Sequence, residues 1–227
     1  MTPNIPTRSR AKRYGRRRPL PAIIGLAILA TASVIVWMNV LHQADNTTAQ
    51  AQCPAGASTP AKLPSLTPLP YTALDKVAPA PPGLVKVRTL NASTQVGLAG
   101  RIDGELQKLG FVSAATPADD PRYPLGDMRC FGQIRFGPNG ESAARTVSLV
   151  EPCAQLVEDH RQDTTVDVAL GEYANDIAPT PDTQLVLVDL TAWAARHPAA
   201  NGGLQSQSGQ LPSVPASLLA AAHSFQC

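Results

Sequence analysis

The chain has 227 residues, of which 22 are proline and 16 are glycine, whereas charged residues supply only 16%. This length allows one folded domain with accessory segments. Aromatic residues make up only 4%, so there are few rings for stacking bases, and a binder of single-stranded nucleic acid is disfavoured. The net charge of +2 combines two unlike regions, because residues 1–41 hold seven of the 19 Lys and Arg residues and no acid. The remainder carries 12 bases against 17 acids.

Residues 22–41 form a run of twenty residues without a formal charge. A helix of this length covers about 30 Å, the thickness of a hydrocarbon core. The seven cations precede it, in a basic arm at residues 1–21, and the segment that follows it is HQADNTT, with one acid and no base. This asymmetry predicts a single-pass transmembrane helix with a cytoplasmic N-terminus and an extracytoplasmic C-terminal domain.

Two other interpretations of the N-terminal region compete with a membrane anchor. A basic run can bind nucleic acid, but next to an apolar helix it is more often a topology signal, so we expect no nucleic-acid partner. A cleaved signal peptide has a shorter apolar region than residues 22–41. The retained anchor therefore explains this region best.

All four cysteines lie after the apolar run: Cys53, Cys130, Cys153 and Cys227. An even set of cysteines in an exported segment predicts two disulfides, with three possible pairings. There is no C-x-x-C motif, so we expect neither a zinc site nor redox chemistry.

Low-complexity segments flank the predicted domain. Residues 42–82 contain eight prolines, which predicts a semi-rigid, extended extracytoplasmic stalk. Residues 198–227 contain a linker, NGGLQSQSGQ, and continue through a short apolar helix at Leu218–Ala222 to a tail that ends in a cysteine.

Residues 83–197 show the hydrophobic periods of strands and helices. Val85, Val87 and Thr89 alternate with charged residues, as in a strand. Apolar residues from Val96 to Leu109 recur at helical spacing, and Gly110 follows as a stop signal. The predicted elements are a strand at 84–89, a helix at 96–109, strands at 111–116 and 131–136, a helix between Asn139 and Pro152, a strand at 166–170 and a final helix at 181–196.

The last of these elements is ambiguous, because the run Leu185–Leu190 is also compatible with a buried strand. Thr180 in the cap position, Pro181 at the first helical position and Asp182 in the first turn favour a helix. The order is therefore β-α-β-β-α-β plus a C-terminal helix. This order predicts an α/β (α+β) two-layer sandwich, with helices on one face of a mixed sheet.

The predicted order also suggests a disulfide pairing. The strand at 131–136 rises about 20 Å, and the helix after it returns nearly the same distance. Cys130 opens that strand and Cys153 follows that helix, so we expect these two cysteines to pair. Cys53 then pairs with Cys227 and ties the stalk to the tail.

Three segments in this order resemble the LytR C-terminal domain family: VRTLNASTQVGLAGRIDGELQKLGF, RFGPNGESAARTVSLV and VDVALGEY. They match its strand and turn before a helix, its second turn and Ala-rich helix, and its final strand, over about residues 84–177. No catalytic domain of the LytR-CpsA-Psr type fits in the stalk. The resemblance implies a non-enzymatic envelope module that binds wall polymer or envelope proteins, or a regulatory partner of LytR-CpsA-Psr wall-assembly enzymes.

The chain shows no catalytic, cofactor-binding or metal-binding motif, and its four histidines lack metal-ligand spacing. The acidic run at residues 158–163 is typical of a solvated loop. Two turns are candidate contacts for an anionic polymer, because free N–H groups and the helix dipole attract anions at a helix start. Helix capping alone also explains them, and we expect both at one edge of the sheet. The candidate residues are Asn91, Ser93, Thr94, Gly137, Asn139 and Gly140.

Overall fold

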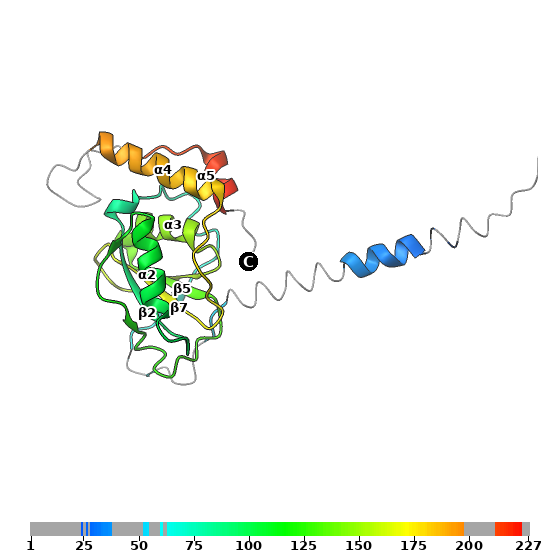
Figure 1. The fold of residues 1–227 in the computed structure, drawn as a ribbon, viewed down its shortest axis with the longest axis horizontal. Helices are drawn as coiled ribbons and strands as arrows, with labels where there is room; N and C mark the ends of the chain where they lie inside the picture. The colour runs from blue at the N-terminus through cyan, green and yellow to red at the C-terminus, as the bar shows by residue number, and fades with distance from the viewer. Residues whose placement is uncertain are drawn as a thin grey trace, which may run out of the picture. The chain divides into compact units, whose positions relative to one another are not determined.

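The computed structural model describes residues 24, 26, 28–37, 52–54, 60, 63–197 and 212–223. After residue 45 the described segments belong to one compact unit (Figure 1). Its elements are β1 (Thr67–Pro68), η1 (Pro82–Leu84), β2 (Lys86–Asn91), α2 (Leu98–Lys108), β3 (Val112–Ser113), β4 (Ala118–Asp119), β5 (Gly132–Phe136), η2 (Pro138–Gly140), α3 (Glu141–Val150), β6 (Gln155–Glu158), β7 (Val166–Leu170), α4 (Pro181–Arg196) and α5 (Ala216–His223).

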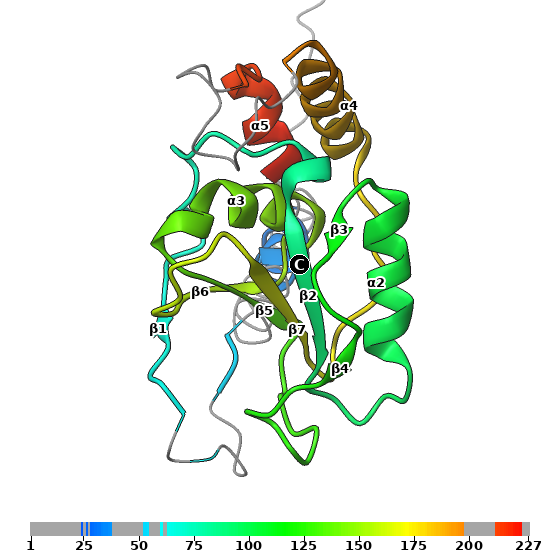
Figure 2. The same cartoon turned by 90° about the vertical axis from the view of Figure 1, so that its left-hand side faces the viewer.

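The strands form one mixed sheet in the order β1-β6-β5-β7-β2-β3, with β4 also paired to β2. β2 runs parallel to β3, β4 and β7, and β5 runs parallel to β6, whereas β5 and β7 are antiparallel. Two β-α-β units, β2-α2-β3 and β5-α3-β6, therefore meet on either side of β7 (Figure 2). The predicted mixed α/β architecture is confirmed.

Helices α2 and α3 cover one face of this sheet, because alternate strand residues and one stripe of each helix are apolar. Val87 and Val168 from the strands pack in the same buried cluster as Ile102 of α2 and Val147 of α3. A smaller cluster joins α3 to α4 and α5 through Leu149 and Leu190, among others. The central strands thus pack against both helices on one face, and their other face is left for polar side chains.

The second β-α-β unit differs from the prediction. The strand at 166–170 does not close it; β6 (Gln155–Glu158) does, a strand that is not among the predicted elements. β7 instead inserts between the two units, in the centre of the sheet. A four-residue strand offers too few alternations to be recognised, but Leu156 and Val157 are buried, so tertiary packing fixes it.

The first helix begins two residues later than its apolar spacing predicts. Val96 was placed in the buried stripe but is fully exposed, at 101%. Gly97 precedes Leu98 in the left-handed region, at φ 78°, and no side chain caps the helix. Gly110, at φ 92°, ends this helix as predicted.

The final element is a helix, as its capping signal predicts. The Thr183 N–H donates to Thr180 Oγ1 at 3.2 Å, and Pro181 occupies the first helical position. Its buried side chains include Val186 and Leu190, which contact α3 and α5. The strand interpretation of Leu185–Leu190 is therefore wrong.

Part of the predicted stalk belongs to the folded unit. β1 pairs with β6, and Leu74 and Ala80 are buried in the main core. The Tyr71 ring stacks on His223 of α5 at a centroid distance of 4.0 Å. The prediction of an extended stalk is wrong for residues 67–82, because their leucine and alanine side chains bury apolar surface that proline content does not reveal.

The disulfide pairing also differs from the prediction. Cys53 is bonded to Cys130, with a Cα–Cα distance of 5.1 Å. Cys153 is disulfide-bonded as well, and Cys227, to which the prediction joins Cys53, lies outside the described residues. Strand and helix lengths predict the end of the sheet at which Cys130 and Cys153 lie, but not the face. Cys130 packs with Met128 and Tyr123 on the face opposite α3, which explains why Cys130 and Cys153 do not pair.

Within the predicted span, residues 24, 26 and 28–37 are helical, and large apolar side chains such as Ile35 and Trp37 are exposed. No helix in the described part of the chain is both long enough and apolar enough to cross a membrane. The rest of residues 22–41, the basic arm at 1–21 and residues 198–211 lie outside the described residues.

Candidate functional site

The sheet face opposite α2 and α3 carries a cluster of charged side chains. Strand alternation places Arg88 of β2, Arg135 of β5 and Asp167 of β7 on this face, while Val87, Ile134 and Val168 point to the helices. We call the cluster the ionic face. It consists of Arg88, Asp120, Arg135, Asp159, Arg161 and Asp167.

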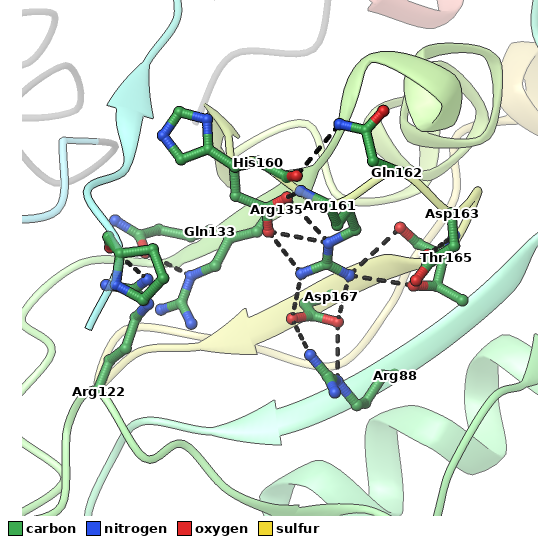
Figure 3. Close-up of polar contacts among 12 residues, drawn as sticks. Arg88, Arg122, Gln133, Arg135, His160, Arg161, Gln162, Asp163, Thr165 and Asp167 are labelled. Carbon is green, nitrogen blue, oxygen red and sulfur yellow. Dashed lines mark hydrogen bonds and ion pairs between the residues drawn. The ribbon is translucent and has the colours of Figure 1, made fainter. Parts of the chain in front are cut away.

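Arg161 joins two carboxylates of the ionic face. Its Nη2 lies 2.6 Å from Asp159 Oδ2 and 2.6 Å from Asp167 Oδ2, and its Nη1 donates to the Thr165 carbonyl at 3.3 Å. Figure 3 shows Arg161 between Asp167 and Thr165. Burial alone would lower the pKa of Arg161, but the hydrogen bonds to Asp167 and Asp159 outweigh it and raise that pKa.

Asp167 is the centre of the cluster because its carboxylate accepts hydrogen bonds from two guanidinium groups. Burial would raise the pKa of Asp167, but hydrogen bonds from Arg161 and Arg88 lower it below its ordinary value. Arg88 donates through Nε at 2.9 Å and Nη2 at 2.6 Å. Its side chain is 46% exposed, so Asp167 orients a guanidinium that is still accessible to an outside acceptor.

Arg135 and Asp120 form a second, fully buried pair. Arg135 Nη2 lies 2.7 Å from Asp120 Oδ2, and the two side chains are 3% and 0% exposed. Arg135 Nε donates to Gln133 Oε1 at 2.9 Å, and its guanidinium lies 5.9 Å from the centre of the Tyr123 ring. This pair fastens the loop that carries Asp120 and Tyr123 to the sheet.

The acidic run at 158–163 is not a solvated loop throughout. Glu158 ends β6, and the side chains of Asp159 and Arg161 are only 13% and 15% exposed. Sequence reasoning missed Arg88, Arg135 and Asp167 because alternating charged residues in a strand are typical of a solvated face. Opposite charges on three predicted strands were the available signal, but strand order was needed to pair them.

The two candidate polymer-binding turns lie at opposite ends of the sheet, not at one edge. Asn91 at the end of β2 pairs with Leu170 at the end of β7. β5 runs the other way, since Arg135 near its end pairs with Asp167 near the start of β7. With about 3.3 Å per residue, the two turns are about 13 Å or more apart, so one small anion cannot contact both.

An internal carboxylate occupies the first turn. The Thr94 N–H and Oγ1 donate to Glu172 at 3.1 Å and 3.0 Å, and the Ser93 N–H donates to Asn91 Oδ1 at 3.1 Å. These bonds stabilise the turn itself and do not cap α2, whose N-cap is Gly97. An outside anion has to displace Glu172 to reach Thr94.

The second turn packs against the loop after β6. Asn139 Nδ2 donates to the Gln162 carbonyl at 2.7 Å, and α3 has no side-chain cap, since its N-cap is Gly140. A Cβ on Gly137 would lie 1.9 Å from the Arg161 carbonyl oxygen, so glycine is required by this close approach. The turn therefore positions Arg161, and its contact with a polymer stays a prediction.

Replacing Glu172 by glutamine is expected to lower the free energy of unfolding by about 1–2 kcal/mol, because hydrogen bonds to a charged acceptor are lost at Thr94. Denaturant unfolding measures this loss. Glu141→Gln, at an exposed position in α3, is the matched control, and it should cost about 0.5 kcal/mol or less. Equal effects of the two substitutions would contradict the assigned role of Glu172.

Within the described residues, no three His, Cys, Asp or Glu side chains are placed to hold a metal ion together. The polar surface thus consists of paired arginines and carboxylates with one half-exposed guanidinium. Such a surface can position hydrogen-bond donors for an anionic or hydroxyl-rich ligand.

The sequence of the central part of this unit defines a LytR C-terminal type of domain. Residues 84–173 match the family model LytR_C, described as LytR cell envelope-related transcriptional attenuator. Over 219 residues the chain is also 36% identical to the cell envelope integrity protein Cei of Mycobacterium tuberculosis (strain ATCC 25618 / H37Rv), covering 94% of this chain and 92% of that protein. The chain therefore belongs to the family of the cell envelope integrity protein Cei.

A solved structure supports this assignment. The soluble domain, residues 71–217, of a conserved hypothetical secreted protein from Mycobacterium marinum is 36% identical to this chain. The match has a TM-score of 0.57 and covers 73% of this chain and 99% of the solved one. The match extends beyond residues 84–173, so the similarity includes segments outside the LytR C-terminal domain.

Proposed function

We propose that this chain is a membrane-anchored, non-enzymatic protein whose extracytoplasmic domain maintains the cell envelope by binding wall polymer or envelope proteins. The observation that carries this proposal is the nearly end-to-end similarity to the cell envelope integrity protein Cei, over 94% of this chain and 92% of that protein. A match of this extent includes the N-terminal region, the domain and the tail together.

The extracytoplasmic location is supported by two independent features. Residues 22–41 are uncharged and follow seven cations, a pattern that keeps the N-terminus in the cytoplasm. The Cys53–Cys130 disulfide joins residues on the far side of this run, and disulfides persist in oxidising compartments. The relative from Mycobacterium marinum is described as secreted. Protease added to wall-stripped cells should therefore cleave the domain.

The ionic face supports contact with an anionic wall polymer. Arg88 is held by Asp167 and is half exposed, and Lys86 lies on the same face two residues earlier in β2. A guanidinium that is already oriented loses little side-chain freedom when it binds a phosphate or carboxylate. The turn at Asn91–Thr94 would contact the polymer only if the polymer displaced Glu172 from Thr94.

Sedimentation with isolated cell wall tests the proposal. Residues 45–227, which include the compact unit, should pellet with wall material. Arg88→Ala should weaken this binding several-fold. Arg101→Ala is the matched control, because Arg101 is also an arginine in an ion pair, is 45% exposed and lies on α2. No pelleting of the wild-type domain, or equal effects of both substitutions, would contradict polymer binding through the ionic face.

A regulatory partner of wall-assembly enzymes is the second candidate function. It is favoured by the match to the LytR family model and by apolar side chains on the outside of α4, where Leu185 and Val188 are exposed. In this case photo-crosslinkers at positions 185 and 188 should capture an envelope enzyme in cells. Crosslinkers at exposed positions of α2 are the control and should not.

A further inference from the structure

A cavity of about 230 Å³ lies between the end of α3, the segment before α4, and α5. Its walls include Val150 of α3, Ile177 of the connecting segment and Ala222 of α5. For comparison, an engineered apolar cavity of about 150 Å³ takes benzene. The cavity is therefore large enough for a short alkyl chain with a polar end. It is separate from the ionic face, because it lies on the helix-covered side of the sheet.

In the described part of the chain, one carboxyl oxygen of a residue in the cavity wall has no hydrogen-bond partner. Glu151 lines the cavity, and its Oε1 is shielded from solvent and makes no hydrogen bond. Burial, with a contribution from Glu105, raises the pKa of Glu151 to about 8. A buried polar atom without a partner costs free energy, so a ligand that supplies a donor or a cation to Glu151 would stabilise the site.

The charged groups around Glu151 favour a cation. Glu105 of α2 repels it and accepts a hydrogen bond from the Ile177 N–H at 2.8 Å. Asp176, which also lines the cavity, is paired with Arg101 of α2. None of the ion pairs among the described residues includes Glu151. An anion would meet these carboxylates, whereas an ammonium group would relieve their repulsion.

We propose that this cavity binds a primary alkylammonium group, with Glu151 as the counterion and the alkyl stem against Val150, Ile177 and Ala222. This proposal depends on the proposed function for one point only, which is the source of the amine. We assign the amine to the diamino-acid side chain of a wall peptide. A lysine-like side chain fits this chemistry, because its four-carbon stem is apolar and its ammonium is a compact donor of three hydrogen bonds.

Binding of an ammonium group requires ionised Glu151, so it releases a proton at neutral pH. The pKa of Glu151 is about 8, whereas a lysine-type amine stays charged up to about pH 10. Affinity should therefore rise about tenfold per pH unit from pH 6 toward pH 8 and level off above it. Glu105 and Asp176 are the other acids near the site, and Arg101 is the nearby base that pairs with Asp176.

NMR titration of residues 45–227 with Nα-acetyl-lysine methylamide tests the proposal. A soluble domain from the Mycobacterium marinum relative has been crystallised, which supports the use of this part alone. The amide signals of Val150 and Ile177 should shift. Glu151→Gln should weaken binding at least about tenfold, whereas Glu141→Gln, at the exposed start of the helix that Glu151 follows, should leave it unchanged.

The Nε-acetylated form of the probe separates an ammonium site from a merely apolar one. It keeps the alkyl stem but carries no charge, so it should bind at least about tenfold more weakly. No shift with the free amine, equal binding of the two forms, or an affinity that does not change with pH would overturn the proposal. Thermal melting checks the variant, since Glu151→Gln removes an acid whose Oε1 is shielded from solvent and should melt at or above the wild-type temperature at pH 8.

A soluble wall peptide with a free diamino-acid amine tests the assigned source, with its N-acetylated form as control. Binding of the free form alone would support the assignment. Binding of the lysine derivative without binding of the wall peptide would overturn the source. Because the probe is a small molecule, this test is independent of wall sedimentation, so the cavity proposal and the proposed function can fail separately.

Discussion

Asp120→Ala is expected to lower the free energy of unfolding by about 3–5 kcal/mol, because it leaves the Arg135 guanidinium buried without its counterion. The two side chains are 0% and 3% exposed and lie 2.7 Å apart. Asp120 Oδ1 also accepts the Arg122 N–H at 2.9 Å, so the loop loses a second bond. Denaturant unfolding monitored by circular dichroism measures the change.

An exposed ion pair of the same residue types is the control for this prediction. Asp176 and Arg101 are paired on the surface, with side chains that are 67% and 45% exposed. Asp176→Ala should therefore cost about 1 kcal/mol or less. The double variant Asp120→Ala/Arg135→Met has no uncompensated buried charge. It should therefore be more stable than the single variant Asp120→Ala. A loss below about 1 kcal/mol for Asp120→Ala would contradict the role of the buried pair.

Removing the Cys53–Cys130 disulfide is expected to destabilise the domain by about 4 kcal/mol. The bond closes a loop over a sequence separation of 77, and a crosslink over a long loop restricts the unfolded chain strongly. Unfolding of the double variant Cys53→Ala/Cys130→Ala, compared with the oxidised wild type, measures this effect. Double substitution is required because a single one leaves a free thiol that can exchange with Cys153.

Peptide mapping without reductant checks the pairing itself. It should yield one crosslinked pair of peptides that contains Cys53 and Cys130. A pair that joins Cys130 to Cys153 would restore the pairing that strand and helix lengths predict and would contradict the structure. Reductant should lower the free energy of unfolding of the wild type by more than that of the double variant, because the double variant lacks this bond already. The double variant is therefore the control.

The Cys53–Cys130 bond and the buried pair act on the same loop. Cys130 lies at its end, Asp120 at its start, and Tyr123 packs in the same apolar cluster as Cys130 and Cys53. Together they cover part of the sheet face that α2 and α3 leave open, and they leave Arg88 at the uncovered part. The loop thereby limits which part of this sheet face is open to solvent.

Local sequence signals were sufficient where the chemistry is local. The Thr180 cap with Pro181 predicted the start of α4, and Gly110 predicted the end of α2, because a cap or a left-handed residue acts within one helical turn. The alternation of β2 and β7 predicted two strands for the same reason. The mixed α/β class and the resemblance to the LytR C-terminal domain therefore followed from the sequence alone.

Only the tertiary structure decided which residues meet across the sheet. Strand and helix lengths predicted that Cys130 and Cys153 lie at the same end of the sheet. Cys130 lies on the face opposite α3, however, and there it is bonded to Cys53. Insertion of β7 between β5 and β2 brings Asp167 to Arg88 and Arg161, and it turns β5 so that Gly137 and Asn91 lie at opposite ends. Hydrophobic periodicity records which face of an element is buried. It does not record which element packs against that face. The interaction energy of two side chains depends on the distance between them, which the fold sets.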